Sequence, residues 1–173
     1  HLAFAGAVED LYPQLRAQPV SYKVFGTVCE QVAKLEIMEQ YDTKDYIVTS
    51  GILYANRTRT LGELDIVVLR RSDEEAILIG EVKCWRDLSG AQKKARSQLS
   101  RFTGTISSGT EISMHSDGQN GKTYDRDQFD EQPKIITISQ QGGENFGFEH
   151  TIGIDLQEAR ELYQMLNRGR SQR

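Results

Sequence analysis

The stretch of sequence that decides the fold is GELDIVV at residues 62–68, followed after a polar turn by IGEVK at residues 79–83. Both segments are rich in β-branched residues and have the composition of strands. They nevertheless carry Asp65, Glu81 and Lys83, three charged residues in segments whose other residues suggest a buried hairpin. Unpaired charge is costly in such a place, so the three residues call for a chemical explanation.

The hairpin register predicts which of these charges meet. If the turn is centred on Asp73, Asp65 lies directly opposite Glu81, with Cβ atoms about 5 Å apart, and Glu63 lies opposite Lys83. Two carboxylates so placed repel each other unless a cation lies between them. Oxygen ligands select a hard ion, so we expect Mg²⁺ or Mn²⁺. Glu63 is interpreted instead as an ordinary cross-strand charge of the kind that protects sheet edges.

The pattern fits the chemistry of phosphodiester cleavage. A metal ion held by Asp65 and Glu81 would polarise a phosphoryl group and lower the pKa of an attacking water. Lys83 would orient that water and offset the charge that develops on the phosphate oxygens. The backbone carbonyl of Val82 is a candidate further ligand. The alternative, that all these charges form structural cross-strand pairs, is disfavoured by the apolar residues that flank them.

Hydrophobic periodicity predicts a single α/β domain over residues 1–173, with a mixed central sheet flanked by helices. Helices are expected over 3–17, 21–41 and 89–103, and a last one opens with a capping box at 155–158. Strands are expected over 46–54 (with a break or bulge at 50–51), 61–69, 76–83, 134–139 and 150–154. Residues 104–132 predict a long loop or an irregular hairpin.

An Asp on one strand and Glu-x-Lys on the next, after a helix bearing a Glu, resembles the PD-(D/E)xK nuclease superfamily. The resemblance covers about residues 22–103, with Glu63-Leu64-Asp65 in place of the literal Pro-Asp. In that superfamily the Asp and the Glu bind the metal and the Lys assists the chemistry, which implies these roles for Asp65, Glu81 and Lys83.

The same resemblance implies roles for two further residues. The helical Glu, often a metal or water ligand, maps onto Glu30, with Glu36 in reserve. A Gln on the following helix, in a Gln-Leu-x-x-aromatic pattern, maps onto Gln98. The resemblance therefore implies a restriction-endonuclease-like fold and catalysis by Asp65, Glu81, Lys83, Glu30 and Gln98 with Mg²⁺ or Mn²⁺.

The superfamily includes restriction enzymes, Holliday-junction resolvases and toxin nucleases, so the substrate stays open. DNA is the first expectation, with endonuclease action favoured over exonuclease action. An RNase, such as a tRNA-cleaving toxin domain of a larger secreted protein, is the alternative. A non-catalytic module on the same fold, binding nucleic acid or another protein, is the third interpretation. A homodimer or an inhibitor protein would be compatible partners.

Charge is unevenly distributed along the chain. The net charge is −4, but residues 83–101 contain six basic residues and one acidic residue, so the remainder carries −9. Such a segment is typical of a phosphate-binding cleft, and equally of a solvated helix face. The predicted nucleic-acid contacts are Arg86, Lys93, Lys94, Arg96 and Arg101. Trp85, the only tryptophan, is expected to pack in the core rather than to stack on a base.

Cys29 and Cys84 lack metal-ligand spacing and are interpreted as buried free thiols, which favours a reducing, cytoplasmic location. No apolar run approaches a membrane span and no signal peptide is evident, so we expect no membrane association. The chain begins with His1 rather than Met, which suggests a piece of a longer polypeptide. A delivered toxin domain is compatible with that origin.

Overall fold

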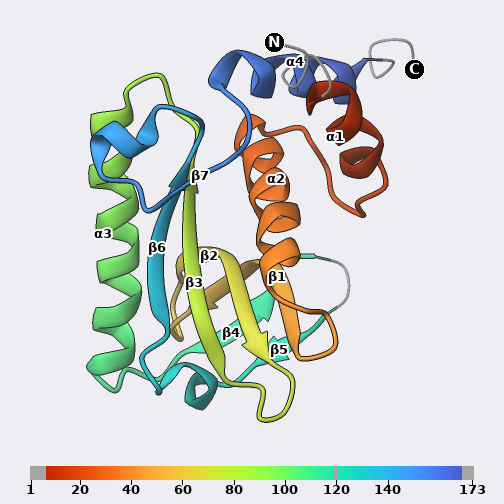
Figure 1. Ribbon diagram of the computed structural model, residues 1–173. Helices are drawn as coiled ribbons and strands as arrows, with labels where there is room; N and C mark the ends of the chain where they lie inside the picture. Colours follow the sequence, from red (N-terminus) through yellow and green to blue (C-terminus); the bar gives the residue numbers. More distant parts are fainter. Residues whose placement is uncertain (1–6, 119–120, 169–173) are drawn as a thin grey trace.

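A computed structural model describes residues 7–118 and 121–168, in which four α-helices flank a seven-stranded mixed sheet (Figure 1). The helices are α1 (Ala7–Arg16), α2 (Phe25–Gln40), α3 (Leu88–Ser107) and α4 (Leu156–Asn167). The strands are β1 (Tyr46–Ala55), β2 (Thr60–Arg70), β3 (Ala76–Lys83), β4 (Ser113–Ser116), β5 (Thr123–Tyr124), β6 (Lys134–Ser139) and β7 (His150–Thr151). Short 3₁₀ helices η1 (Arg126–Phe129) and η2 (Gly143–Phe146) lie between them. The expected α/β class is confirmed.

The strand order is β5-β4-β1-β2-β3-β6-β7, which sets the predicted hairpin in the middle of the sheet. Strands β1 to β3 form an antiparallel meander, and β6 and then β7 continue the sheet in parallel. The parallel step from β3 to β6 is reached through α3, as a crossover connection requires. Strands β2 and β3 are therefore central strands, with pairing partners on both sides.

The register of the β2–β3 hairpin agrees with the prediction. Ile66 pairs with Gly80, and Val67 pairs with Ile79, which is the spacing that aligns Asp65 with Glu81. The register shifts by one residue only beyond Val68, next to the turn. The two acidic positions consequently lie level with each other on neighbouring strands, just beyond the Ile66–Gly80 pair.

Each face of the sheet supports its own hydrophobic core. On one face, α1, α2 and α4 pack over strand side chains such as Ile66, Val68 and Ile138. On the other, Leu99 and Phe102 of α3 join a second cluster that continues under β4, β5 and η1. Figure 1 shows α2 and α3 on opposite sides of the central strands. Alternation along β2 and β3 supplies apolar side chains to both cores, which explains their nearly continuous apolar sequences.

One local expectation needs revision, and one that was open is decided. The break or bulge expected in β1 at residues 50–51 is wrong, because β1 pairs with β2 in the same register on both sides of Gly51. Gly51 itself has a φ of +69°. The register shift occurs instead between Tyr54 and Ala55. Residues 104–132 take the irregular-hairpin form, because β4 pairs with β5. Ala3 and Phe4, expected in the first helix, lie outside the described residues.

The last helix begins where the capping box predicts. Asp155 Oδ1 accepts from the Glu158 backbone N–H at 2.8 Å, and Glu158 Oε1 accepts from the Asp155 N–H at 3.1 Å. These reciprocal bonds satisfy two N–H groups that a helix start otherwise leaves unpaired. In the described part of the chain, none of the helices has the combined length and apolar character needed to cross a bilayer.

Candidate active site

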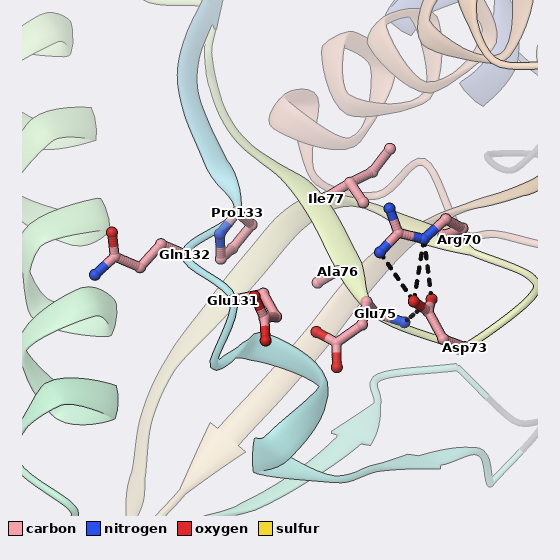
Figure 2. Close-up of a pocket in the computed structure, with 8 residues that line it drawn as sticks. All are labelled: Arg70, Asp73, Glu75, Ala76, Ile77, Glu131, Gln132 and Pro133. Carbon is pink, nitrogen blue, oxygen red and sulfur yellow. Dashed lines mark hydrogen bonds and ion pairs between the residues drawn. The ribbon is translucent and has the colours of Figure 1, made fainter.

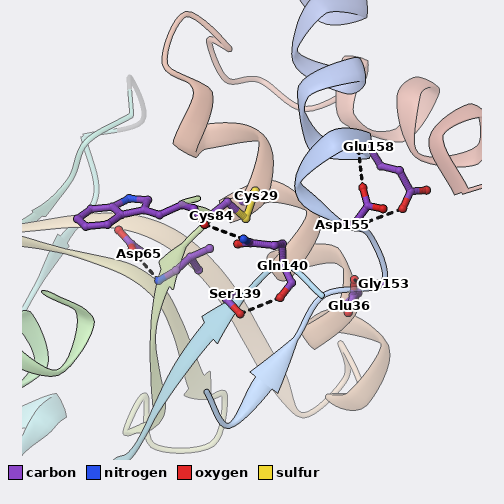
Figure 3. Close-up of a disulfide and its surroundings, with 11 residues drawn as sticks. Cys29, Glu36, Asp65, Cys84, Ser139, Gln140, Gly153, Asp155 and Glu158 are labelled. Carbon is purple, nitrogen blue, oxygen red and sulfur yellow. Dashed lines mark hydrogen bonds between the residues drawn. A yellow bond between two sulfur atoms is a disulfide. The ribbon is translucent and has the colours of Figure 1, made fainter. Parts of the chain in front are cut away.

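Asp65 is held on β2 by the backbone of the neighbouring strand. Its Oδ2 accepts a hydrogen bond from the Val82 N–H at 2.9 Å, and the side chain is only 6% exposed (Figure 3). A carboxylate fixed by a main-chain donor cannot rotate freely, so its second oxygen has a defined position. This bond uses the N–H of Val82; the role expected for the Val82 carbonyl as a metal ligand stays a prediction.

Glu81 and Lys83 form an ion pair along β3. Lys83 Nζ donates to Glu81 Oε1 at 2.9 Å, and the Glu81 side chain is 2% exposed. Residues two apart on a strand face the same side, which is why the Glu-x-Lys spacing allows this contact. A buried carboxylate with one charged donor is only partly compensated.

The carboxyl groups of Asp65 and Glu81 lie close enough to hydrogen-bond each other. Burial raises the pKa of Glu81 to about 8, reinforced by the charge of Asp65 and opposed by Lys83. Burial likewise raises the pKa of Asp65, against the lowering effects of Lys83 and the Val82 N–H. The pair therefore resists carrying two negative charges without additional positive charge nearby.

Two more glutamates complete what we call the acidic cluster, defined as Glu30, Glu63, Asp65 and Glu81. Burial and then the charge of Asp65 raise the pKa of Glu30, on α2, to about 8 and that of Glu63 to about 7. The sequence suggests only an ordinary cross-strand charge for Glu63, whereas in the structure its carboxyl group interacts with that of Asp65. Its register position opposite Lys83 was the sequence signal that could have found it.

The reserve candidate Glu36 lies elsewhere on α2. Its Oε2 accepts from the Gly153 N–H at 2.8 Å, and its Oε1 lies 3.2 Å from His150 Nε2. These contacts tie α2 to the chain around β7, so Glu36 has a packing role. Of the two helical glutamates, it is Glu30 that interacts with Asp65 and Glu81.

The donor set of the acidic cluster fits a hard divalent cation. Four buried or half-buried carboxylates interact there with the single amine of Lys83, and burial, reinforced by the repulsion between them, raises the pKa of Glu30, Glu63 and Glu81. Within residues 7–118 and 121–168, no group of three or more Asp, Glu, His or Cys side chains is already arranged to hold a metal ion. Mg²⁺ commonly uses one or two carboxylates and keeps several waters, so Asp65 and Glu81 suffice as a core.

Gln98 lies on α3, which packs against β3 and β6. Its carbonyl Oε1 is buried and has no hydrogen-bond partner among the described residues. An orphaned buried acceptor costs free energy on the order of 1–3 kcal/mol unless something donates to it. A bound water would satisfy it, in keeping with the expected role of this residue.

The predicted nucleic-acid contacts divide into two groups. Arg86, Lys93, Lys94 and Arg101 are exposed, and Arg101 Nη1 also donates to the Leu61 carbonyl at 3.3 Å. Arg96 instead pairs with Glu149. That carboxylate also accepts from the Thr137 N–H, at 2.7 Å, and from the Thr137 hydroxyl. Arg96 thus stabilises the packing of α3 against the loop before β7.

The expectation of free thiols is wrong, because Cys29 and Cys84 form a disulfide across 55 residues of sequence (Figure 3). Cys29 lies on the buried side of α2 and Cys84 directly follows β3, so helix-on-sheet packing brings them together. The bond joins the residue before Glu30 to the residue after Lys83. On the other side of Glu30, buried Gln31 donates to Ser50 Oγ at 3.2 Å, so α2 is attached to both β3 and β1.

A cavity of about 520 Å³ lies at the opposite end of β3, around the β2–β3 turn (Figure 2). Its lining residues are Arg70, Asp73, Glu75, Ala76, Ile77, Glu131, Gln132 and Pro133. Arg70 is already paired with Asp73 at 2.9 Å. None of the predicted site residues lines this cavity.

Comparisons with protein-family models, with curated proteins and with solved structures each find no match for this chain. The resemblance to PD-(D/E)xK nucleases therefore depends on Asp65, Glu81, Lys83, Glu30 and Gln98 themselves and stays a prediction.

Proposed function

We propose that this chain is a metal-dependent nuclease that hydrolyses phosphodiester bonds, with DNA as the first substrate and endonuclease action favoured. One observation carries the proposal. Two buried carboxylates, Asp65 and Glu81, meet on central strands beside Lys83 and Glu30, with more negative charge than the amine can balance. A purely structural hairpin would gain nothing from burying such a surplus.

In this proposal, the residues of the acidic cluster and their neighbours have distinct roles. Asp65 and Glu81 would hold Mg²⁺ or Mn²⁺, with the Val82 carbonyl as a candidate third ligand. The ion would polarise the phosphoryl group and lower the pKa of the attacking water. Lys83 would orient that water and stabilise the negative charge that grows on the phosphate oxygens. Glu30 and Gln98 would accept hydrogen bonds from the water and keep it in line.

Exposed basic side chains that follow Lys83 in the sequence support a polyanionic substrate. Arg86, Lys93 and Lys94 are exposed at or shortly after the end of β3, and Arg101 follows along α3. Contacts of this kind fix a nucleic-acid backbone without reading its sequence. The proposal therefore includes phosphate binding along α3, without Arg96, which is paired internally.

The test is a cleavage panel. Wild-type protein and Asp65→Ala would be incubated with plasmid DNA, single-stranded DNA and tRNA in Mg²⁺, Mn²⁺ or EDTA. We expect plasmid cleavage with either metal, none in EDTA and none by Asp65→Ala. The matched control is Asp73→Ala, since Asp73 is an exposed aspartate that pairs with Arg70 and accepts from the Glu75 N–H at the remote turn. Equal cleavage by Asp65→Ala and wild-type protein would contradict the proposal.

A second candidate, an RNase domain delivered as a toxin, is favoured by the Cys29–Cys84 disulfide. Disulfides form and persist in oxidising compartments, so this bond suits a protein that passes outside the reducing cytoplasm. Preferential cleavage of tRNA in the same panel would select this candidate. Nucleic-acid binding without cleavage under any metal condition would instead leave a non-catalytic binding module.

A further inference from the structure

Trp85 is exposed where it was expected to be buried. The only tryptophan of the chain lies two residues past the end of β3, and 42% of its surface is open to solvent. A large aromatic side chain stabilises a fold mainly through the area it buries, so this indole contributes far less than it could. Its exposure leaves an aromatic face available to a ligand.

The backbone that carries this indole is fixed on both sides. The preceding residue, Cys84, is bonded to Cys29. The Trp85 carbonyl accepts from Nε2 of the buried Gln140 at 2.8 Å. Two residues later, Asp87 caps α3 by accepting from the Gly90 N–H at 3.0 Å. A side chain on so constrained a backbone is pre-organised, which reduces the entropy cost of binding.

The position of Trp85 relates it to the acidic cluster. Side chains alternate along an extended chain, and Cys84 faces α2 while Lys83 faces Glu81. Trp85 follows Lys83 by two residues, so the Cα atoms of these residues are at most about 7 Å apart. The neighbouring Arg86 is exposed and adds positive charge.

We propose that Trp85 stacks on an unpaired base next to the phosphate held at Asp65, Glu81 and Lys83, so that the protein prefers single-stranded or locally opened nucleic acid to continuous duplex. This inference rests on the proposed nuclease function. The face of a base is open to an aromatic side chain only when the base has left its stack. Stacking of this kind tolerates any sequence, because every base has an aromatic face.

The single tryptophan gives a direct readout, since all indole fluorescence comes from Trp85. Lys83→Ala protein in Mg²⁺, slowed in cleavage, would be titrated with a single-stranded DNA 12-mer, its RNA counterpart, the blunt DNA duplex and an abasic 12-mer. We expect saturable quenching by the single strands and little by the duplex or the abasic strand. Quenching by either strand supports the proposal, and the tighter one identifies the sugar.

Affinity measured by fluorescence anisotropy of labelled strands completes the test. Trp85→Ala should weaken single-strand binding roughly 5- to 150-fold, while Trp85→Phe restores most of it. Met38→Ala, at an exposed apolar position on α2, is the control, and its affinity should equal that of the protein with both Met38 and Trp85 intact. Strands that bind and are cleaved by wild-type protein without quenching, or with equal affinity for Trp85→Ala, would overturn this inference alone. No binding of any strand would overturn the nuclease proposal as well.

Discussion

At the scale of single residues, Lys83 and a metal ion would draw on the same carboxylate. Lys83 Nζ lies 2.9 Å from Glu81 Oε1, so the ammonium group already neutralises part of the charge that a cation would use. We predict that Lys83→Ala still binds Mn²⁺, because it removes a competing positive charge and no ligand. Cleavage should fall by a factor on the order of 10² to 10³ through lost transition-state stabilisation.

Calorimetry with Mn²⁺ and single-turnover cleavage would separate these two effects. Asp65→Ala should lose both metal binding and cleavage, whereas Lys83→Ala should lose cleavage alone. Lys44→Ala, at an exposed turn position, serves as the control and should behave as wild type. A Lys83→Ala protein that cleaves at the wild-type rate would remove Lys83 from the mechanism.

Glu149 should make stability depend on pH in the acid range. Burial alone would raise its pKa, but hydrogen bonds from Thr137 and the pairing with Arg96 lower it overall from 4.5. A carboxyl whose pKa is lower in the folded state contributes stability above its unfolded pKa, and loses it as pH falls through the folded value. We predict that Glu149→Gln is less stable than wild type at pH 7, and that the difference shrinks as pH falls below 4.5 and is lost below the pKa of Glu149 in the folded state.

Urea denaturation at a series of pH values measures this directly. Glu111→Gln provides the comparison, because Glu111 pairs with Arg57 on the open surface, where both side chains are about four-fifths exposed. Exposed pairs of this kind contribute little, so that variant should match wild type throughout. A difference for Glu149→Gln that persists at low pH would show that packing, and not ionisation, is responsible.

At the scale of elements, the disulfide attaches the helix that carries Glu30 to the strand that carries Glu81 and Lys83. Closing a loop of 55 residues restricts the unfolded chain and is worth up to about 4 kcal/mol. We predict that reduction lowers the free energy of unfolding by a few kcal/mol and reduces cleavage, because Glu30 loses its fixed distance from the strand. Gln31, which still bonds Ser50, should keep α2 docked.

Guanidinium denaturation and cleavage assays with and without dithiothreitol would measure both consequences. The double variant Cys29→Ala/Cys84→Ala is the control, since added reductant should not change it further. Cleavage that is equal in the oxidised and reduced forms, under conditions where both are folded, would show that the disulfide serves stability only.

Elements defined by local sequence could be predicted, and those defined by distant contacts could not. The β2–β3 register followed from the spacing of Asp65 and Glu81 about the turn, and the start of α4 followed from Asp155 and Glu158. The disulfide could not be derived in this way. It joins two buried positions 55 residues apart, and buried free thiols have the same local sequence pattern.

At the scale of the whole molecule, charge is separated between an acidic body and the basic segment 83–101. We predict that charge reversal at Lys94 and Arg101 weakens nucleic-acid binding and flattens its salt dependence. Binding releases fewer counterions when fewer phosphates are contacted. Binding measured over a range of NaCl concentrations tests this. Arg96→Glu should differ, since it breaks the pair with Glu149 and so lowers stability. An unchanged salt slope for the Lys94 and Arg101 variants would move the phosphate path away from α3.

The candidate site could be predicted in part from the sequence. Asp65, Glu81 and Lys83 were evident because charges are conspicuous in apolar strands, and the structure brings them together with Glu30. Glu63 was set aside because an edge-strand charge has the same sequence signature; only the strand order shows that β2 is central. Trp85 was expected in the core because the sequence does not reveal how the chain leaves the sheet between β3 and α3.

The Cys29–Cys84 bond also changes how the molecule would respond to mechanical force. When the two ends of an oxidised chain are pulled apart, tension passes through the sulfur atoms and bypasses residues 30–83 between them. At 3.3–3.6 Å per extended residue, roughly 190 Å of contour length stays hidden until the bond is reduced. The strands that carry Asp65, Glu81 and Lys83 all lie inside that shielded loop, so stretching the ends cannot draw them out into a single extended strand.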